Sequence, residues 1–339
     1  MSTTGHILLA HGGGGQLMAE LIHQVILPAL GAEKSSGLYD AASIRAGRGR
    51  LLLTTDSYVV QPVEFPGGDI GKLSVCGTIN DLAVCGGKPV ALSLALVLEE
   101  GLEIELLRRV LVSAGRAARE AGVAIVTGDT KVVERRGQPG MIINTAGVGV
   151  PLPKARLAFE RIGRGDAVIL SGPLGQHGLA VMCARKGLSV APALASDCAP
   201  LHGLAAALIA ALGAKVKWMR DPTRGGLAAT LAELSSATSR NVEIRQRDIP
   251  VHPTALAAAE MLGLDLLNVA NEGKLVAVVA ADAAQKAVEI LRRHAIASRS
   301  AVIGAIGETA DVPLVELLTR AGGRRVVQMP YGEDLPRIC

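Results

Sequence analysis

Four aspartates in apolar or small-residue surroundings are the side chains of this sequence best suited to chemistry. Asp56 closes LLLTTD, Asp81 interrupts CGTINDLAVCGG, Asp129 ends VAIVTGD and Asp221 opens DPTRGG. A carboxylate is costly to bury unless a cation pairs with it. Oxygen ligands from several segments suit Mg²⁺, which usually bridges to nucleotide phosphates. Each aspartate alone could be a helix cap or a turn residue, but the four together favour a metal–nucleotide site.

A glycine-rich element near the N-terminus could hold phosphate groups. HGGGG at residues 11–15 lies between the strand-like run ILLA and a helical pattern that starts at Gln16. Glycines let backbone amides approach a phosphate closely, and the N-terminus of a helix adds partial positive charge. The pattern G-x-x-x-x-G-K-[ST] of a Walker loop is absent. The element is therefore either a phosphate loop or a flexible connection.

Two segments combine a carboxylate with a lysine. In TGDTKVV, Lys131 follows Asp129 by two residues, and in NVANEGKLV the residues Asn271, Glu272 and Lys274 directly precede an apolar run. A carboxylate beside an amide and a cation can act as a general base when its environment tunes its pKa. Without further context the residues alone favour a polar loop with a surface ion pair, and both interpretations stay open here.

The chain ends in YGEDLPRIC, so its last residue is the thiol Cys339. A chain end cannot pack tightly on every side, which makes Cys339 a poor core residue. At about 3.3–3.6 Å per residue, the tail after Pro330 can span roughly 30 Å, so the thiol could enter a pocket away from its anchor. The other four cysteines form no C-x-x-C pair and lie among Ala and Leu, which predicts mostly buried free thiols: residues 76, 85, 183 and 198.

The composition argues against nucleic-acid and membrane partners. The apolar runs, such as LAAALIAAL from Leu204, are far shorter than the ~20 residues of a spanning helix. The first residues contain no basic region followed by a long apolar stretch, so no signal peptide is expected and we predict a cytoplasmic protein. The net charge of +4 is mild, and two Phe, three Tyr and one Trp offer little surface on which bases could stack.

The elements that must position these residues follow an α/β pattern. β-Rich apolar runs predict strands at 50–60, 90–98, 123–128 and 142–150, and apolar residues at three- and four-residue steps predict a helix over 103–121. The second half repeats the alternation, with helices expected near 175–186, 199–212, 225–239 and 282–297 and strands in AVILSG, KLVAVVAA, AVIGAIG and RRVVQMP. Asp282, followed three residues later by Gln285, predicts a capping box.

The length of 339 residues predicts two domains. Prolines and clustered charges in PLPKARLAFERIGRGDAV mark a boundary near residue 151. We therefore expect one domain over residues 1–150, a second over 151–330 and a flexible tail over 331–339 that carries the terminal cysteine.

Six motifs, in this order, give the chain a resemblance to one family over essentially its whole length. TTDSYVV, TINDLAV, TGDTKVV, DPTRGGLA, NEGK and the terminal PRIC resemble the HypE family of hydrogenase maturation factors, within the aminoimidazole-ribonucleotide-synthetase-like (PurM-like) ATP-binding superfamily. The resemblance has one departure, since Gly13 stands where a serine is expected. A phosphate cradle made of backbone amides should survive that change.

The resemblance implies a two-domain α/β (α+β) PurM-like fold whose N-terminal sheet pairs across a homodimer into a barrel, with ATP and Mg²⁺ between the domains. Asp56, Asp81 and Asp221 would hold the metal, Glu272 would be the base, and Lys131 would polarise the substrate or relay charge. The ATP site would combine the glycine-rich loop with polar residues of several segments: Gly12, Gly13, Gly14, Asp56, Asp81, Asp129, Asn144 and Asn271.

The activity implied by the resemblance explains the terminal thiol. A partner, HypF, would place a carbamoyl group on Cys339, ATP would drive its dehydration to a thiocyanate, and the cyano group would pass to iron held by a HypC–HypD complex. Selenophosphate synthetase, a rival in the same superfamily, has its reactive residue near the glycine-rich loop, but no cysteine precedes Cys76 here. Thiamine-monophosphate kinase and aminoimidazole ribonucleotide synthetase have no use for a terminal cysteine. A non-catalytic, ATP-sensing carrier is the alternative of another class.

Overall fold

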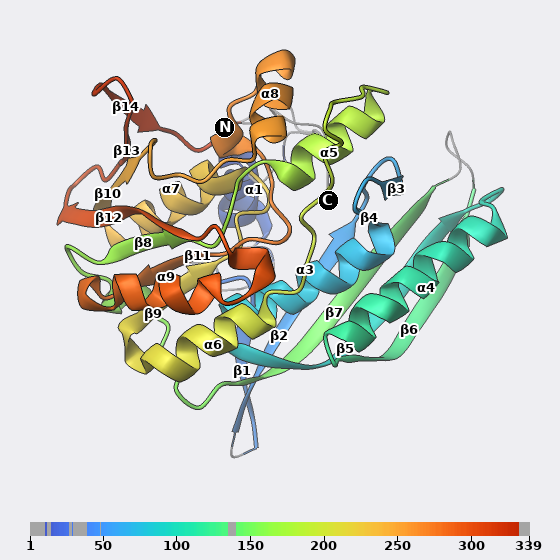
Figure 1. The fold of residues 1–339 in the computed structure, drawn as a ribbon. Helices are drawn as coiled ribbons and strands as arrows, with labels where there is room; N and C mark the ends of the chain where they lie inside the picture. The colour runs from blue at the N-terminus through green and yellow to red at the C-terminus, as the bar shows by residue number, and fades with distance from the viewer. Residues whose placement is uncertain are drawn as a thin grey trace.

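The chain forms two α/β units that lie side by side, each built on its own sheet (Figure 1). The computed structural model describes residues 11, 15–26, 29, 39–47, 49–134 and 140–331. The first sheet has the strand order β1-β2-β7-β5-β6 and the second the order β14-β13-β10-β12-β8-β11-β9. This two-unit α/β architecture agrees with the expected fold class.

The first sheet is antiparallel except where β5 and β6 pair in parallel. Its strands are β1 (Ala42–Ala46), β2 (Gly49–Tyr58), β5 (Gly87–Glu99), β6 (Ala124–Val133) and β7 (Met141–Pro151), and a small hairpin joins β3 (Glu64–Phe65) to β4 (Gly68–Asp69). The four strands expected from the sequence are confirmed. Helices α3 (Ile70–Val84) and α4 (Ile104–Glu120) cover one face of this sheet (Figure 1). The predicted amphipathic helix at 103–121 is α4.

Helix α3 is the central element between the two units. It begins after Asp69, whose carboxylate accepts hydrogen bonds from the backbone N–H groups of Gly71 (2.8 Å) and Lys72 (3.0 Å) and so caps the helix. Nearly all of its residues are buried, because the helix packs on the first sheet, on α4 and on α6 of the second unit. A helix buried all round has no amphipathic period.

The second sheet is covered by helices on both faces. Along β8, Val168 and Leu170 pack towards α7, while Ala167 and Ile169 pack towards α6 and α9, as the period of two along a strand requires. The strands are β8 (Ala167–Leu170), β9 (Val216–Arg220), β10 (Arg240–Arg245), β11 (Val276–Val279), β12 (Ala301–Thr309), β13 (Val315–Leu318) and β14 (Arg324–Val327). Only β10 and β13 pair in parallel.

The second unit contains the four expected helices and one that was not expected. They are α5 (Gln176–Arg185), α6 (His202–Leu212), α7 (Gly226–Thr238), α8 (Pro253–Leu262), which the sequence analysis missed, and α9 (Ala284–Arg292). The predicted capping box is wrong. The residue before α9 is Ala283, which makes no side-chain cap, and the carboxylate of Asp282 instead lies 2.6 Å from the ammonium group of Lys215. Short 3₁₀ turns complete the unit: η3 (Phe159–Arg161), η4 (Gly213–Lys215), η5 (Leu266–Asn268), η6 (Ala281–Ala283) and η7 (Ala295–Ala297).

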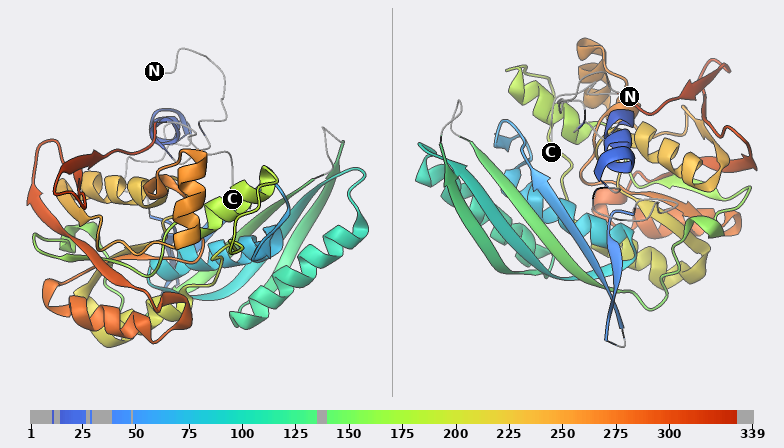
Figure 2. Two further views of the ribbon diagram at one scale, coloured as in Figure 1. Left: turned by 45° about the horizontal axis from the view of Figure 1, so that its top comes forward. Right: turned by 180° about the vertical axis from the view of Figure 1, so that it is seen from behind.

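A helical segment near the N-terminus lies against the second unit (Figure 2). It consists of α1 (Gln16–Leu21), which continues as the π-helical turn η2 (Ile22–Ile26). Within the described part of the chain, no helix has the length and apolar character needed to cross a bilayer. Three of the four described cysteines are buried, the fourth is half-buried and all four are free thiols, as expected: Cys76, Cys183, Cys198 and Cys85.

Candidate active site

A cleft of about 700 Å³ lies between the two units, within the size range of small-molecule sites. Its walls come from α1, the end of β2, α3, the segment after β9, α7 and the segment after β14. Representative lining residues, in chain order, are Met18, Asp56, Asp81, Asp221, Glu233 and Met329. Elements far apart in the sequence therefore meet at one site.

Three carboxylates of this cleft converge on one point. Asp40, Asp81 and Asp221 each offer an oxygen, and these oxygens all lie within 4.8 Å of one another. Burial and then the charge of Asp40 raise the pKa of Asp221 to about 8, although Arg220 opposes the shift. Burial and the charges of neighbouring carboxylates also raise the pKa of Asp81 well above its ordinary value. A cluster of buried and half-buried oxygen donors that resist ionisation together is the donor set that a hard divalent cation would bind.

Arg220 fixes one member of this cluster. Its guanidinium lies 3.0 Å from the carboxylate of Asp40 and 2.7 Å from that of Glu233 on α7. Burial raises the pKa of Asp40 to about 6, against the lowering effect of Arg220. Thr54 on β2 completes the frame, because its hydroxyl lies 2.7 Å from the Asp81 carboxylate and 2.9 Å from the carbonyl oxygen of Asp40.

Asp56 lies in the same cleft but outside the group of three. The hydroxyl of Tyr58 donates to its carboxylate at 3.2 Å, and the guanidinium of Arg224 lies 4.0 Å from it. The structure thus brings together Asp81 and Asp221 as expected and adds Asp40. A metal-binding role for Asp56 stays a prediction.

A small pocket adjoins the cleft and is lined by Glu272. The two cavities share Asp56, Asp81 and Asp221 in their walls, and Tyr58 lines the small pocket with Glu272. Glu272 is 2% exposed. Burial, followed by the charges of Asp221 and Asp197, raises the pKa of Glu272 well above its ordinary value. A carboxylate with a raised pKa that faces a cavity is suited to accept a proton.

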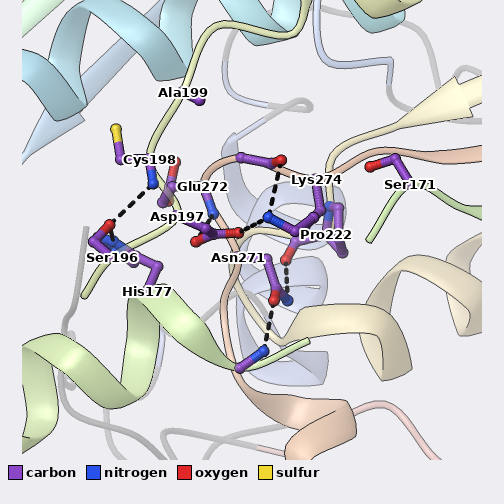
Figure 3. A network of polar contacts seen from close by, with 12 residues as sticks. Ser171, His177, Ser196, Asp197, Cys198, Ala199, Pro222, Asn271, Glu272 and Lys274 are labelled. Atoms are coloured by element: carbon purple, nitrogen blue, oxygen red, sulfur yellow. Dashed lines mark hydrogen bonds and ion pairs between the residues drawn. The ribbon is translucent and has the colours of Figure 1, made fainter. Parts of the chain in front are cut away.

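The NEGK segment around Glu272 is held by buried polar contacts (Figure 3). The amide of Asn271 donates to the carbonyl oxygens of Val269 (2.8 Å) and Pro222 (3.3 Å), and its oxygen accepts the N–H of Gly175 (2.8 Å). Asn271 is fully buried and does not line the cleft, so it positions backbone segments. Lys274 forms a buried ion pair with Asp197 at 2.8 Å. The surface ion pair that the sequence left open for this segment is therefore excluded.

Three other predicted site residues lie on the first sheet and do not line the cleft. Asp129 and Lys131 are on the edge strand β6, both exposed, and form an ion pair at 2.8 Å. Asn144 on β7 donates to the carbonyl oxygen of Asp56 and to the hydroxyl of Ser57, both at 2.9 Å. Ser57, Asn144 and Asp129 stand in one row across the sheet, through Ala95, on the face away from α3.

The remaining predicted residues, Gly12, Gly13, Gly14 and Cys339, lie outside the described residues. Their neighbours are described. Gly15 lines the cleft, and α1 starts directly after it. The N–H of Gln16 donates to the carbonyl oxygen of Pro330 at 2.9 Å and that of Leu17 to the carbonyl oxygen of Tyr331 at 3.2 Å. The root of the C-terminal tail is therefore joined to a helix that lines the cleft.

Three residues of the site were not predicted from the sequence: Asp40, Arg220 and Asp197. Asp40 sits in LYDAAS and Asp197 in ASDCAP, segments without periodicity that read as loops. Of the three, Arg220 had a feature that could have identified it, because it directly precedes Asp221 at the end of a strand. An arginine that is half-buried at such a position needs carboxylate partners.

The fold and the cleft define a class of protein, and comparison with known proteins identifies it. The chain matches the family model "AIR synthase related protein, N-terminal domain" at residues 39–151 and "AIR synthase related protein, C-terminal domain" at residues 163–315. It is 46% identical over 335 residues to the carbamoyl dehydratase HypE of Rhizobium leguminosarum bv. viciae, a match that covers 99% of this chain and 95% of the relative.

Two solved structures are also similar over almost the whole chain. HypE in a HypE–HypF complex gives a TM-score of 0.85 at 42% identity, covering 91% of this chain and 99% of that one. HypE in complex with ATP gives a TM-score of 0.82 at 40% identity, covering 98% and 100%. The chain is thus an AIR-synthase-related protein with the two-domain PurM-like fold. Within that class it belongs to the HypE family of carbamoyl dehydratases, which confirms the resemblance inferred from the six motifs.

Proposed function

We propose that this protein is a hydrogenase maturation enzyme that uses ATP to dehydrate an S-carbamoyl group on Cys339 to a thiocyanate. The observation that carries the proposal is the joining of three features at one cleft: a carboxylate cluster, a pocket lined by Glu272 and the root of the tail at Met329. Residues 332–339 can extend by roughly 28 Å at about 3.3–3.6 Å per residue, which is long enough to return the thiol to the cleft.

The cleft suits ATP with a divalent cation. Its volume of about 700 Å³ accommodates a nucleotide, and Asp40, Asp81 and Asp221 supply the hard oxygen donors that Mg²⁺ prefers. When bound there, Mg²⁺ would neutralise charge on the phosphates during phosphoryl transfer. Gly12, Gly13 and Gly14 precede the helix at the cleft and are proposed phosphate contacts. Asp56 is proposed as a further metal ligand because it lines both the cleft and the small pocket.

The chemistry requires a better leaving group and a base. The amide oxygen of the S-carbamoyl group takes the γ-phosphoryl group of ATP, and ADP leaves. The nitrogen then gives up its two protons, one to a base and one to the departing phosphate, as the carbon–oxygen bond breaks and the nitrile is left. Glu272 is the proposed base, because its raised pKa makes its carboxylate a strong proton acceptor. The negative charge of Asp221 is one cause of this raised pKa. A cation bound at Asp221 would offset that charge and so favour the ionised form of Glu272.

Three of the proposed site residues do not line the cleft of a single copy and would need a second copy of the chain to reach one. The face of the first sheet opposite α3 exposes apolar side chains, which favours pairing of two sheets in a homodimer. Asp129, Lys131 and Asn144 lie on or beside that face, so such a dimer would surround them and could carry Lys131 to a cleft as the polarising or relaying group. On this proposal residues 1–150 form the ATP-binding, dimer-forming domain, 151–330 the second domain and 331–339 the substrate-bearing tail.

The family's partners are proposed for this chain too: HypF as the carbamoyl donor and HypC–HypD as the acceptor of the cyano group, in the cytoplasm. The similarity to a HypE–HypF complex supports the first of these. The decisive experiment is mass spectrometry of the carbamoylated protein with MgATP. We expect the tail to lose the mass of one water while ADP and phosphate form. Nucleotide binding with no loss of mass would instead establish the non-catalytic carrier.

Two variants refine this experiment. Glu272→Gln should bind ATP and stall before the nitrile forms, because the amide cannot accept the proton. Cys339→Ala should keep nucleotide affinity and form no thiocyanate.

A further inference from the structure

The backbone N–H and carbonyl groups of Glu272 both form hydrogen bonds with other segments of the chain. Its N–H donates to one carboxylate oxygen of Asp197 at 3.3 Å. Its carbonyl oxygen accepts the side-chain amide of Asn80, on α3, and the N–H of Ala199, both at 3.3 Å. Asn80 also accepts the N–H of Leu201 at 2.7 Å, which ties the segment 197–201 to α3. These contacts fix the backbone of Glu272 relative to α3, the helix that also carries Asp81.

Asp197 is itself held by a buried counterion (Figure 3). Its second carboxylate oxygen lies 2.8 Å from the ammonium group of Lys274, and the two side chains are only 3% and 4% exposed. Two ions removed from water carry a large desolvation cost, and a well-packed apolar pair is often at least as stable. A buried ion pair is therefore poorly explained by stability alone. What it does provide is a fixed carboxylate directly behind the backbone of Glu272.

The contact between the two segments is close enough to require a glycine. A Cβ atom on Gly273 would collide with the carbonyl oxygen of Asp197. The three consecutive residues therefore have different roles. Glu272 lines the small pocket, Gly273 allows close contact with the backbone of Asp197, and Lys274 forms the ion pair with the Asp197 carboxylate. The negative charge of Asp197 is also one cause of the raised pKa of Glu272, after burial and Asp221.

We propose that Asp197, with Lys274 as its counterion, is a positioning residue that holds Glu272 at the wall of the small pocket for proton transfer. The proposal rests on the proposed function, since it gives Asp197 a role only through Glu272. Asp197, which lies outside any helix or strand, would then be one of the residues that determine the rate of dehydration.

The test compares the buried pair Asp197–Lys274 with a largely buried ion pair of the same domain. Asp166 and Lys217 form a pair at 2.7 Å with 7% and 18% exposure, and Asp166 also accepts a backbone N–H, that of Gly163, at 2.7 Å. This pair resembles Asp197–Lys274 but does not touch Glu272. Asp197→Asn and the matched control Asp166→Asn are each measured for thermal stability, KM for ATP and kcat for thiocyanate formation on the carbamoylated protein.

We expect both variants to lose stability, and only Asp197→Asn to lose kcat, by about 10- to 100-fold at unchanged KM for ATP, because small misplacements of a catalytic group have effects of this size. If Asp197→Asn fails to fold, the double variant Asp197→Asn/Lys274→Met removes the unpaired buried ammonium and gives the same readout.

Wild-type kcat in a folded variant at residue 197 would overturn the proposal while leaving the function intact. Wild-type kcat in Glu272→Gln would overturn the role of Glu272 and this inference with it. Absence of thiocyanate from the unaltered protein would overturn the proposed function itself.

Discussion

The backbone N–H of Gln16 donates to the carbonyl oxygen of Pro330 at 2.9 Å, so the first residue of the helix that lines the cleft holds the root of the C-terminal tail. The first N–H groups of a helix have no partner inside the helix and must find one elsewhere. Here the tail supplies it, and the position of the tail root is thereby linked to the wall of the cleft.

This bond can be removed without disturbing the helix. Gln16→Pro lacks the N–H, yet proline is well tolerated at the first helical position, and Gly15 already has the extended backbone that precedes a proline. We expect a folded protein with unchanged ATP affinity and a dehydration rate lowered by about 2- to 10-fold, because a looser root lowers the effective concentration of the thiol at the cleft.

Gln16→Ala is the control for this variant, since it loses the same side chain and keeps the N–H. The comparison is made by single-turnover mass spectrometry of the carbamoylated protein. Equal rates for the alanine and proline variants would show that the tail root needs no attachment to α1.

The sequence predicts the strands of the first sheet better than its central helix, for a physical reason. Strands β2, β5, β6 and β7 are β-rich apolar runs that can be recognised locally. Helix α3 is buried on every side, so its residues show no polar face, and only the cap at Asp69 marks where it begins. Its content of Gly, Ser, Thr and Asn gives no further help, because these residues do not favour a helix.

Site residues can be predicted from the sequence where the residue type and its local surroundings are unusual. They cannot be predicted where they depend on pairing with a residue far away in the sequence. Asp81 and Asp221 stand out because each is a carboxylate in an apolar setting. Asp40 joins them only because Arg220, 180 positions further on, folds onto it. The sequence also could not show that Lys274 pairs with Asp197, because that contact is set by tertiary packing.

Metal binding should release protons in a pH-dependent way. The pKa of Asp221 is raised from 3.8 to about 8 by burial and by Asp40, so the carboxyl still holds a proton at neutral pH in the metal-free protein. A divalent cation must displace that proton, and its apparent affinity should therefore increase from pH 6 to pH 8 and level off above. Calorimetric titration with Mg²⁺ and a nucleotide in two buffers of different ionisation enthalpy measures the released protons.

The same shift has a consequence for stability. A carboxyl whose folded-state pKa is raised stabilises the fold at low pH, and this contribution is lost as the pH rises from about 4 to about 8. Asp221→Asn should therefore raise the melting temperature of the metal-free protein at pH 8 and have little effect at pH 4. A variant that is equally destabilised at both pH values would contradict a raised pKa at this position.

The open face of the first sheet should control assembly. Ile142 on β7, Leu53 on β2 and Val150 on β7 are 40%, 40% and 39% exposed, and they face away from α3. Ile142→Glu places a charge on this face and should convert a dimer to a monomer, because burying an unpaired carboxylate at an interface is costly. Sedimentation velocity would show the shift.

Val312→Glu serves as the control for assembly, because Val312 is 78% exposed and lies between β12 and β13 of the second unit. It should leave the sedimentation coefficient unchanged. A dimer that persists in Ile142→Glu would mean that two copies meet elsewhere, and the proposed route of Lys131 to a cleft would fail with it.

Gly77 on α3 makes room for a hydroxyl that reaches the site. A Cβ atom at this position would collide with the hydroxyl oxygen of Tyr58, which donates to Asp56 at 3.2 Å beside the small pocket. Gly77→Ala should lower the free energy of unfolding by about 1–3 kcal/mol, the range for overpacking a well-filled core, despite the better helix propensity of alanine. Tyr58→Phe removes the colliding oxygen, so the double variant should recover part of this loss. Chemical denaturation of the two single variants and the double variant gives the coupling energy. Additive losses would mean that the alanine methyl group is accommodated by another neighbour, and that Gly77 is not what admits the tyrosine hydroxyl to the site.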